Sequence, residues 1–470
     1  MDMTNVLHKN RLYDAGFVQR REWMLYKIRE DRYPFNISIF VETDVFDPSL
    51  FQEVINLMLE RHEILRTTFT VVNGKLKQVV HSSEEYEVNF SSFDMRELPE
   101  SEQRIFHDEK VAAAMGTPFD FETGPLFRIL VFEISANSFL LYFIFHHVIS
   151  DQRSTEIFNT EIIETYKMLV WNPSYKLSEK YIQYREYAHF ENELLDTIKG
   201  AKCRTYWETA LSKGIPELSF VDKNRRDAYT AYYLKKVEEV KVRFYQLPFF
   251  DKRLIGGVIR RYQVEDAGEV LYIYDQCLFE KIQVYQARSK NGFLSLLIGS
   301  LLLAFNKING QKEFAFEIPA SRRVSGIYNQ TMGWLTAGGP CYFDITDQSD
   351  PNKLLGYIDA QLYALSTCCA YPYETLSYNS IPMPGSHMPV FLSLSYLGKN
   401  NHSKESGIVF KRSEGSGTYQ DIAFSFTCYA NSLALKITYN NILFTTDLVE
   451  MVIKKQVESL DYMLTQTAII

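Results

Sequence analysis

The sequence predicts an α/β protein with mixed sheets (α+β) and more than one lobe. Strand and helix signals alternate through the first third of the chain, and the mixed pattern resumes from Glu269 after a polar, tyrosine-rich helical bridge at 166–211. A chain of 470 residues is too long for one small core, so two or three compact parts are expected. The sequence shows no repeat, low-complexity tract or obvious flexible linker.

The first third carries enough elements for a complete lobe. Alternating apolar residues from Phe35 to Val41 predict a strand, and Asp47 as N-cap with Pro48 in the first turn predicts the start of a helix. The expected elements are, in order, a strand at 35–41, a helix at 48–62, strand-like segments around Phe69 and Val79, a charged helix at 101–115, and strands at 126–134 and 139–145.

The second part opens with a charged segment at 222–268, whose broken pattern predicts a surface excursion with some strand. The apolar run at 293–305 contains Ser295, Gly299 and Ser300 and is too short to cross a bilayer, so it predicts a buried helix. The remaining expected elements are a strand from 269, a helix at 277–288, a strand at 313–318, a half-buried strand at 433–439 and a closing amphipathic helix at 447–464.

Composition and charge exclude several classes of partner. The formal net charge of −8 and the pI near 5.7 argue against nucleic acid or an anionic membrane as the principal partner. Six cysteines without a CxxC motif or a regular framework fit a reduced interior, and the polar N-terminus lacks the apolar core of a signal peptide. We therefore expect a cytoplasmic protein.

The candidate reactive site lies where the apolar strand at 139–145 ends. The strand runs directly into His146 and His147, and Ser150 or Asp151 can cap the helix that follows. Neighbouring side chains at such a junction point opposite ways, so one histidine is expected to face a cavity while the other packs or orients it. We expect Asp151 to brace the loop by pairing with a cation from a distant segment.

Two other interpretations of this junction stay open at this point. A single histidine near an apolar face is usually a hydrogen-bonded core residue. Two histidines and an aspartate can also bind a metal ion, but zinc-binding helices place their ligands at i and i+4 of one face, whereas this pair is adjacent on a strand. No other His/Cys cluster in the sequence supplies the missing ligands, so we expect no metal site.

The motifs together form a resemblance that covers nearly the whole chain. Residues 61–69 read RHEILRTTF, residues 118–132 read PFDFETGPLFRILVF, residues 146–151 read HHVISD, and YIQYREYAHF, YWETAL and ITYNNILF follow in order. By these motifs the chain resembles a condensation domain of nonribosomal peptide synthetases, in the chloramphenicol-acetyltransferase-like superfamily. The resemblance implies a V-shaped pseudo-dimer of two such lobes at 1–178 and 179–470. Because no adenylation or carrier segment follows, a freestanding enzyme is expected.

The family signature HHxxxDG places its second histidine in a tunnel between the two lobes. The resemblance therefore implies that His147 is the catalytic histidine and His146 its structural neighbour. Asp151 resembles the aspartate that pairs with an arginine of the second lobe and holds the loop. Aligned on EIPASRR, that arginine falls on Arg323, with Arg322 as the alternative register.

Gln152 and Ser154 complete the residues expected to support this loop, and Gln152 also departs from the family pattern. It replaces the signature glycine, so the turn must tolerate a side chain and a long amide is expected beside the tunnel. The stretch MGWLTAGGP at 332–340 stands where amide-forming members have a GxxVNT-like segment, and it is similar to the GWFT segment of the related epimerization domains. The glutamate of those domains is missing, since its place falls on Pro319 and Glu317 lies two residues early.

The resemblance implies a condensation reaction on a thioester. An acyl or aminoacyl group, carried on the phosphopantetheine of a separate carrier protein, would be joined to an amine to form an amide, with no bound cofactor. The acceptor is either a second carrier-bound amino acid or a soluble small-molecule amine. Neutral His147 would accept the amine proton or orient the nucleophile, so activity is expected to fall in acid. We expect a monomer.

Other functions fit parts of the same pattern. Ester formation with an alcohol is the nearest variant, and an epimerization-type domain or a catalytically silent condensation-like module that recruits carriers are the rivals. An acyl-CoA-dependent transferase of the wider superfamily fits less well, because the plant-type DFGWG segment is absent. Arginine and lysine clusters at 225–226, 252–253 and 260–261 either help an acidic carrier to dock or are solvated loop charge.

Overall fold

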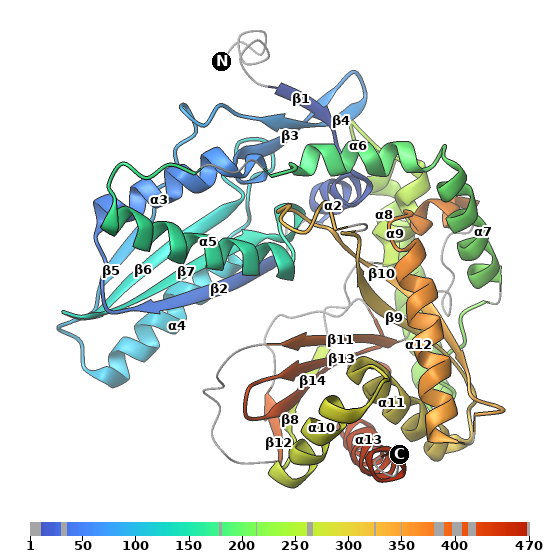
Figure 1. Ribbon diagram of the computed structural model, residues 1–470. Coiled ribbons are helices and arrows are strands. Elements are labelled where there is room, and N and C mark those ends of the chain that lie inside the picture. Colours follow the sequence, from blue (N-terminus) through green and yellow to red (C-terminus); the bar gives the residue numbers. More distant parts are fainter. Residues whose placement is uncertain are drawn as a thin grey trace. The chain divides into compact units, whose positions relative to one another are not determined.

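The computed structural model describes residues 11–29, 35–177, 181–212, 214–260, 267–323, 326–348, 350–379, 390–396, 407–411 and 420–467. The chain divides into two compact units (Figure 1). The first unit contains Met1–Thr197, Arg243–Asp251 and Arg323–Thr336, and the second contains Ile198–Val242, Lys252–Arg322 and Ala337–Ile470. Each unit is therefore built from segments far apart in the sequence, and two short stretches return to the first unit after the chain has entered the second.

The first unit holds two sheets and their helices. A three-stranded sheet has the order β1-β4-β3 and a four-stranded sheet has the order β2-β7-β6-β5. The elements are β1 (Arg11–Asp14), α2 (Phe17–Ile28), β2 (Asn36–Thr43), α3 (Pro48–Arg61), η1 (Glu63–Arg66), β3 (Thr67–Val72), β4 (Lys75–Val80), β5 (Ser91–Asp94), α4 (Glu100–Gly116), β6 (Phe127–Ser135), β7 (Ser138–His146), η2 (His147–Ile149), α5 (Gln152–Trp171) and α6 (Tyr184–Leu194).

The four-stranded sheet carries the two histidines at one of its ends. Strand β7 is antiparallel to both β2 and β6, and its register with β2 pairs His146 with Asn36 and Phe139 with Thr43. The histidine end of β7 therefore lies beside the start of β2. The C-terminal half of β7 is buried on both faces, because residues 143–145 are fully inaccessible to solvent.

Helices cover both faces of this sheet (Figure 1). On one face the Phe143 ring packs against Phe158 of α5, with ring centroids 5.1 Å apart, and against Phe51 of α3 at 6.2 Å. On the other face His107 of α4 packs against Tyr142 at 5.0 Å. Each fully buried phenylalanine contributes about 1.5–3 kcal/mol relative to an exposed one, so this aromatic core fixes β7 and α5 as the frame of the histidine loop.

The second unit is built around a seven-stranded mixed sheet in the order β10-β9-β11-β13-β14-β8-β12. Its elements are α7 (Ile198–Ser212), α8 (Lys223–Phe244), η3 (Lys252–Leu254), α9 (Ile255–Arg260), β8 (Ala267–Ile273), α10 (Gln276–Arg288), α11 (Phe293–Asn309), β9 (Glu313–Ser321), β10 (Thr336–Asp344), α12 (Pro351–Cys368), η4 (Tyr373–Asn379), β11 (Val390–Tyr396), β12 (Gly407–Lys411), β13 (Ile422–Cys428), β14 (Leu433–Asn440) and α13 (Thr446–Thr467). The last two residues of α8 and the first of β10 fall in the first unit. The predicted buried helix is confirmed as α11, whose central residues 296–302 are all buried.

One expected feature of the second part is wrong. The segment at 222–268 is not an excursion with some strand but mostly helix, because Lys223–Phe244 forms the continuous helix α8. Its buried residues Tyr229, Tyr233, Val237 and Val240 recur at helical spacing on one side, while lysine, arginine and glutamate fill the rest of the surface. Because charged residues predominate in the segment, its helical periodicity was not recognised from the sequence.

No helix in the described ranges is both long enough and apolar enough to span a lipid bilayer.

Candidate active site

The two histidines stand at the end of β7 and face different surroundings. The backbone N–H of His146 donates to the carbonyl of Leu126 (2.9 Å), whereas that of His147 donates to the carbonyl of Phe35 (2.7 Å). Because these bonds run to opposite neighbours of β7, successive side chains are presented to opposite sides of the sheet. The two imidazoles therefore have different surroundings.

His146 is a buried, neutral, structural histidine. Its side chain is 5% exposed, and its Nδ1 accepts a hydrogen bond from the backbone N–H of Val148 at 3.0 Å. The ring also stands edge-on to Phe121, with ring centroids 4.7 Å apart. Burial, together with the nearby His147 and Arg128, lowers the pKa of His146 to about 3. An uncharged acceptor of this kind fixes the turn that follows.

The depressed pKa of His146 predicts a specific acid sensitivity of folding. The unfolded chain binds a proton on this residue below its ordinary pKa of about 6.5, whereas the folded chain stays neutral to about 3, so stability is lost as the pH falls below 6.5. The loss between pH 7 and pH 5 is expected to be about 2 kcal/mol. In His146→Asn, whose amide oxygen replaces Nδ1, this part of the loss should vanish, as urea unfolding at both pH values will measure. Equal losses in both proteins would contradict it.

His147 opens the short turn η2, and its imidazole packs against two aromatic rings whose own centroids lie 5.5 Å apart. The ring of Phe35 stacks on it with centroids 4.6 Å apart at an angle of 18°. The indole of Trp334 stacks on it with centroids 3.8 Å apart at 30°. The side chain is half-buried, whereas Trp334 is 4% exposed. This histidine is thus held by ring contacts at a position that solvent still reaches.

Asp151 is the N-cap of α5 and the most heavily bonded side chain of the site. Its carboxylate is 1% exposed, and its two oxygens accept six hydrogen bonds. The donors are Arg323 Nη1 (2.8 Å) and Nη2 (2.9 Å), the Ser154 N–H (2.9 Å) and Oγ (2.7 Å), the Leu335 N–H (3.0 Å) and the Thr336 Oγ1 (3.0 Å). Burial alone would raise the pKa of Asp151, but the bonds and charge of Arg323 outweigh it and the pKa is lowered. Asp151 is a carboxylate at neutral pH.

Ser154 joins the start of α5 to the segment that returns at 326–336. Its Oγ accepts a hydrogen bond from the backbone N–H of Gly333 at 3.0 Å and lies 2.8 Å from the carbonyl oxygen of the same residue. Nη2 of Arg323 lies 3.2 Å from this hydroxyl. Asp151, Ser154 and Arg323 form what we call the carboxylate hub, and it holds the backbone on both sides of Trp334.

The two remaining predicted site residues, Gln152 and Arg322, have other neighbours. Gln152 is exposed on the first turn of α5, and its amide donates to Glu156 at 3.4 Å, one turn further along the helix. Arg322 belongs to the second unit and lies near Cys369, where its positive charge partly offsets the burial that raises the pKa of that thiol. Of the two arginines considered, Arg323 is the one bonded to Asp151.

Sequence reasoning missed two residues that contact His147. The sequence pattern predicts only that Phe35 belongs to a strand, and its place opposite the histidine strand follows once β2 is paired antiparallel to β7. Trp334 lies in the 332–340 segment that departs from the family pattern, and the sequence alone predicts no role for it. The available sequence signal for a role of Trp334 was its position directly after a glycine, Gly333.

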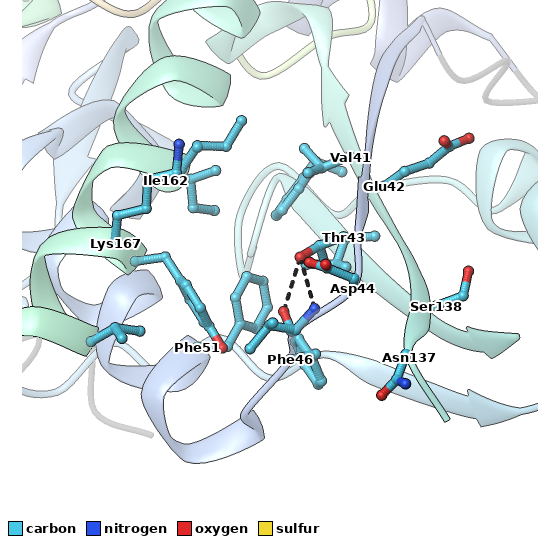
Figure 2. A pocket seen from close by; sticks show the side chains of 16 residues that line it. Val41, Glu42, Thr43, Asp44, Phe46, Phe51, Asn137, Ser138, Ile162 and Lys167 are labelled. Atoms are coloured by element: carbon cyan, nitrogen blue, oxygen red, sulfur yellow. Dashed lines mark hydrogen bonds between the residues drawn. The ribbon is translucent and has the colours of Figure 1, made fainter. Parts of the chain in front are cut away.

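A separate pocket of about 750 Å³ lies at the other end of the same sheet (Figure 2). Its walls come from the end of β2, the loop into α3, the start of β7 and the C-terminal half of α5, including Phe46, Phe51 and Ile162. Between it and the histidines, Phe145 and Phe158 pack with centroids 5.0 Å apart and are fully buried. The pocket is therefore not the place where His147 meets a substrate.

Other candidate features of the sequence have structural partners. Arg226 forms an ion pair with the buried Asp421 at 2.9 Å, and Arg225 donates to the carbonyls of Asn441 and Ile442. Through these contacts, Arg225 and Arg226 link α8 to other parts of the second unit. The pair at 260–261 lies outside the residues whose side chains are described. In the described ranges, no group of three or more His, Cys, Asp or Glu side chains is arranged to bind a metal ion.

The chain is similar to known proteins in both sequence and fold. Residues 9–242 match the model of the condensation domain family. Bacitracin synthase 3 of Bacillus licheniformis is 23% identical over 460 residues, which is 94% of this chain and 6% of that protein. Gramicidin S synthase 2 of Aneurinibacillus migulanus is 29% identical over 209 residues, 44% of this chain and 4% of that protein. The chain thus spans less than a tenth of these curated relatives.

Solved structures extend the fold similarity to almost the whole chain. The epimerization domain from the third module of tyrocidine synthetase B has a TM-score of 0.72 at 15% identity, covering 97% of this chain and 98% of that one. The condensation domain of the monacolin K polyketide synthase has a TM-score of 0.72 at 14% identity, with the same coverage. These likenesses confirm the predicted fold class of mixed α/β lobes.

Proposed function

Because the chain belongs to the condensation domain family, we propose that it transfers an acyl or aminoacyl group from the phosphopantetheine thioester of a carrier protein to an amine, forming an amide. The observation that supports this most directly is the state of the motif at 146–151. His146 is buried, neutral and bonded to the turn, while His147 is half-buried and packs against Trp334. Such a division suits one supporting and one reacting imidazole.

The protein does not need to activate the acyl group, because a thioester is already activated. The amine nitrogen attacks the thioester carbonyl carbon, the C–S bond breaks, and the phosphopantetheine sulfur takes up a proton and leaves as a thiol. Neutral His147 accepts the proton that the amine nitrogen loses, or orients that nitrogen through a hydrogen bond. His146 is unsuited to this role because its Nδ1 is engaged by Val148 and its ring is buried. The acceptor is a carrier-bound amino acid or a soluble amine.

Replacing His147 with alanine is expected to slow single-turnover transfer from a loaded carrier to an amine by about 10²- to 10⁴-fold, the range expected of a general base. The measurement is rapid quench followed by mass spectrometry of the amide. His189→Gln is the matched control, because His189 lies in the same unit with a side chain that is 72% exposed. A His147→Ala protein as fast as the wild type contradicts the proposal. Carrier binding without transfer from any donor would instead indicate a recruitment module.

Epimerization is the second candidate, and one observation favours it. Gly333 to Thr336 reads GWLT, similar to the GWFT of epimerization domains, and Trp334 lies against His147. Against it, Pro319 occupies the place of the family glutamate, and Glu317 accepts a hydrogen bond from Gln420 in the second unit (2.9 Å). Exchange of solvent deuterium at the α-carbon of a carrier-bound residue, without formation of an amide, would select epimerization.

A further inference from the structure

The position of Trp334 depends on the carboxylate hub. The residue before it, Gly333, binds Ser154 through its backbone N–H, and the residue after it, Leu335, donates its backbone N–H to Asp151. The carbonyl of Trp334 itself accepts a hydrogen bond from the hydroxyl of Tyr184 at 3.3 Å. Three consecutive residues are therefore fixed by side chains of α5 and α6, and the indole between them has little freedom.

His147, Phe35 and Trp334 form a three-ring cluster in the first unit, because Phe35 and Trp334 also contact each other with centroids 5.5 Å apart. Phe35 covers one part of the imidazole and Trp334 another, at centroid distances of 4.6 and 3.8 Å. The Arg21 guanidinium of α2 lies 5.4 Å from the Trp334 ring centroid and bonds Glu22 at 2.9 Å, and both of these residues are 3% exposed. Ring–ring and cation–π contacts of this kind favour a particular geometry in addition to the burial of the rings.

We propose that Phe35 and Trp334 are positioning residues that hold the His147 imidazole in one orientation, and that the carboxylate hub acts on His147 through Trp334. The hub thus does more than hold the loop of the motif, because it also places the ring against which the reacting imidazole stacks. Contacts of this kind fix the plane of the imidazole, and with it the directions in which its two nitrogen atoms can bond. The kinetic part of this inference rests on the proposed function.

The test compares two smaller apolar replacements of Trp334, one without a ring and one with a ring. Trp334→Leu keeps an apolar side chain and removes the stack, whereas Trp334→Phe keeps a ring. The expected result for Trp334→Leu is a fall of about 10- to 100-fold in kcat with a smaller change in KM, because a misplaced reacting group costs rate more than binding. Trp334→Phe should remain within about threefold of the wild type if stacking is what positions the imidazole.

A spectroscopic readout distinguishes positioning from general loss of structure. In protein labelled on its nine histidines, the ring protons of His147, assigned with His147→Gln, should move in Trp334→Leu as the ring-current shift is lost. Phe132→Leu is the matched control, because Phe132 is fully buried in the same unit and packs on His107 at 4.9 Å. It should move the His107 signals, leave those of His147 in place and keep the wild-type kcat.

The coupling between hub and indole is tested by a double-mutant cycle. If Ser154 acts through Trp334, then Ser154→Ala should lower kcat in the wild type and have little further effect in Trp334→Leu. Additive effects would overturn the proposed route, and a Trp334→Leu protein with unmoved His147 signals or wild-type kcat would overturn the positioning role. Should Trp334→Leu fail to fold, Phe35→Leu decides by the same two readouts. If His147→Ala is fully active, the proposed function fails while the His147 spectrum still decides the stacking.

Discussion

Replacing Asp151 with alanine is expected to lower the free energy of unfolding by about 3–5 kcal/mol. The variant removes the acceptor of six hydrogen bonds and takes the Asp151 carboxylate away from the Arg323 guanidinium, whose side chain is 5% exposed. It also removes the N-cap of α5, since the Ser154 N–H loses its partner. Urea unfolding at pH 7, followed by circular dichroism, measures this loss.

Two further variants separate the buried charge from the other contacts. In Asp151→Ala combined with Arg323→Met, the buried guanidinium that loses the Asp151 carboxylate is absent as well, so the double variant should be more stable than Asp151→Ala alone. Glu156→Ala is the matched control, because it breaks the Arg153 ion pair on the same helix, where both side chains are more than 40% exposed. That loss should stay below about 1 kcal/mol. An Asp151→Ala protein that loses no more than this control would show that the hub is not a stabilising centre.

The fold was largely predictable because most elements are encoded by local signals. The expected helix at 48–62 is α3, and its predicted cap is observed as the Asp47 carboxylate accepting the Leu50 N–H at 2.8 Å. The closing helix, the half-buried strand at 433–439 and the buried helix at 293–305 are likewise confirmed. The exception is α8, whose narrow buried stripe is outnumbered by charged residues. When polarity is averaged over a charged segment, a narrow stripe of buried residues on one side of a helix is not detected.

The site was less predictable because its contacts join residues far apart in the chain. Spacing within 146–154 was enough to predict the histidine pair and the helix cap, and Asp151 does cap α5. The pairing of Asp151 with Arg323, 172 residues away, followed only from the family resemblance. The stack of Phe35 and Trp334 on His147 depends on a strand register and on a returning segment together. Neither is visible in local sequence, and so the aromatic neighbours of His147 were missed.

Adding a single methyl group at Gly333 is expected to lower the free energy of unfolding strongly. Its φ of +143° lies in a region that residues with a side chain rarely adopt, so any substitution strains the backbone. A Cβ atom built there would lie 1.9 Å from a ring carbon of Tyr184, which is 2% exposed and so is confined by its neighbours. Gly333→Ala should therefore lower the free energy of unfolding by about 3–5 kcal/mol, from backbone strain and overpacking together.

The control for this prediction is another glycine of the first unit. Gly116, at the end of α4, has no atom within 4 Å of the position of its Cβ and no positive φ, so Gly116→Ala should be neutral or raise stability by up to about 1 kcal/mol. Both variants add the same methyl group, and thus their difference in urea unfolding isolates the fit at residue 333. Because the backbone of Gly333 also holds Trp334 beside His147, any folded Gly333→Ala protein should show shifted His147 ring signals. A Gly333→Ala protein as stable as Gly116→Ala would mean that the backbone around residue 333 adjusts without loss of free energy of unfolding. Such a backbone is too adaptable for Ser154 to fix the Trp334 indole by bonding Gly333.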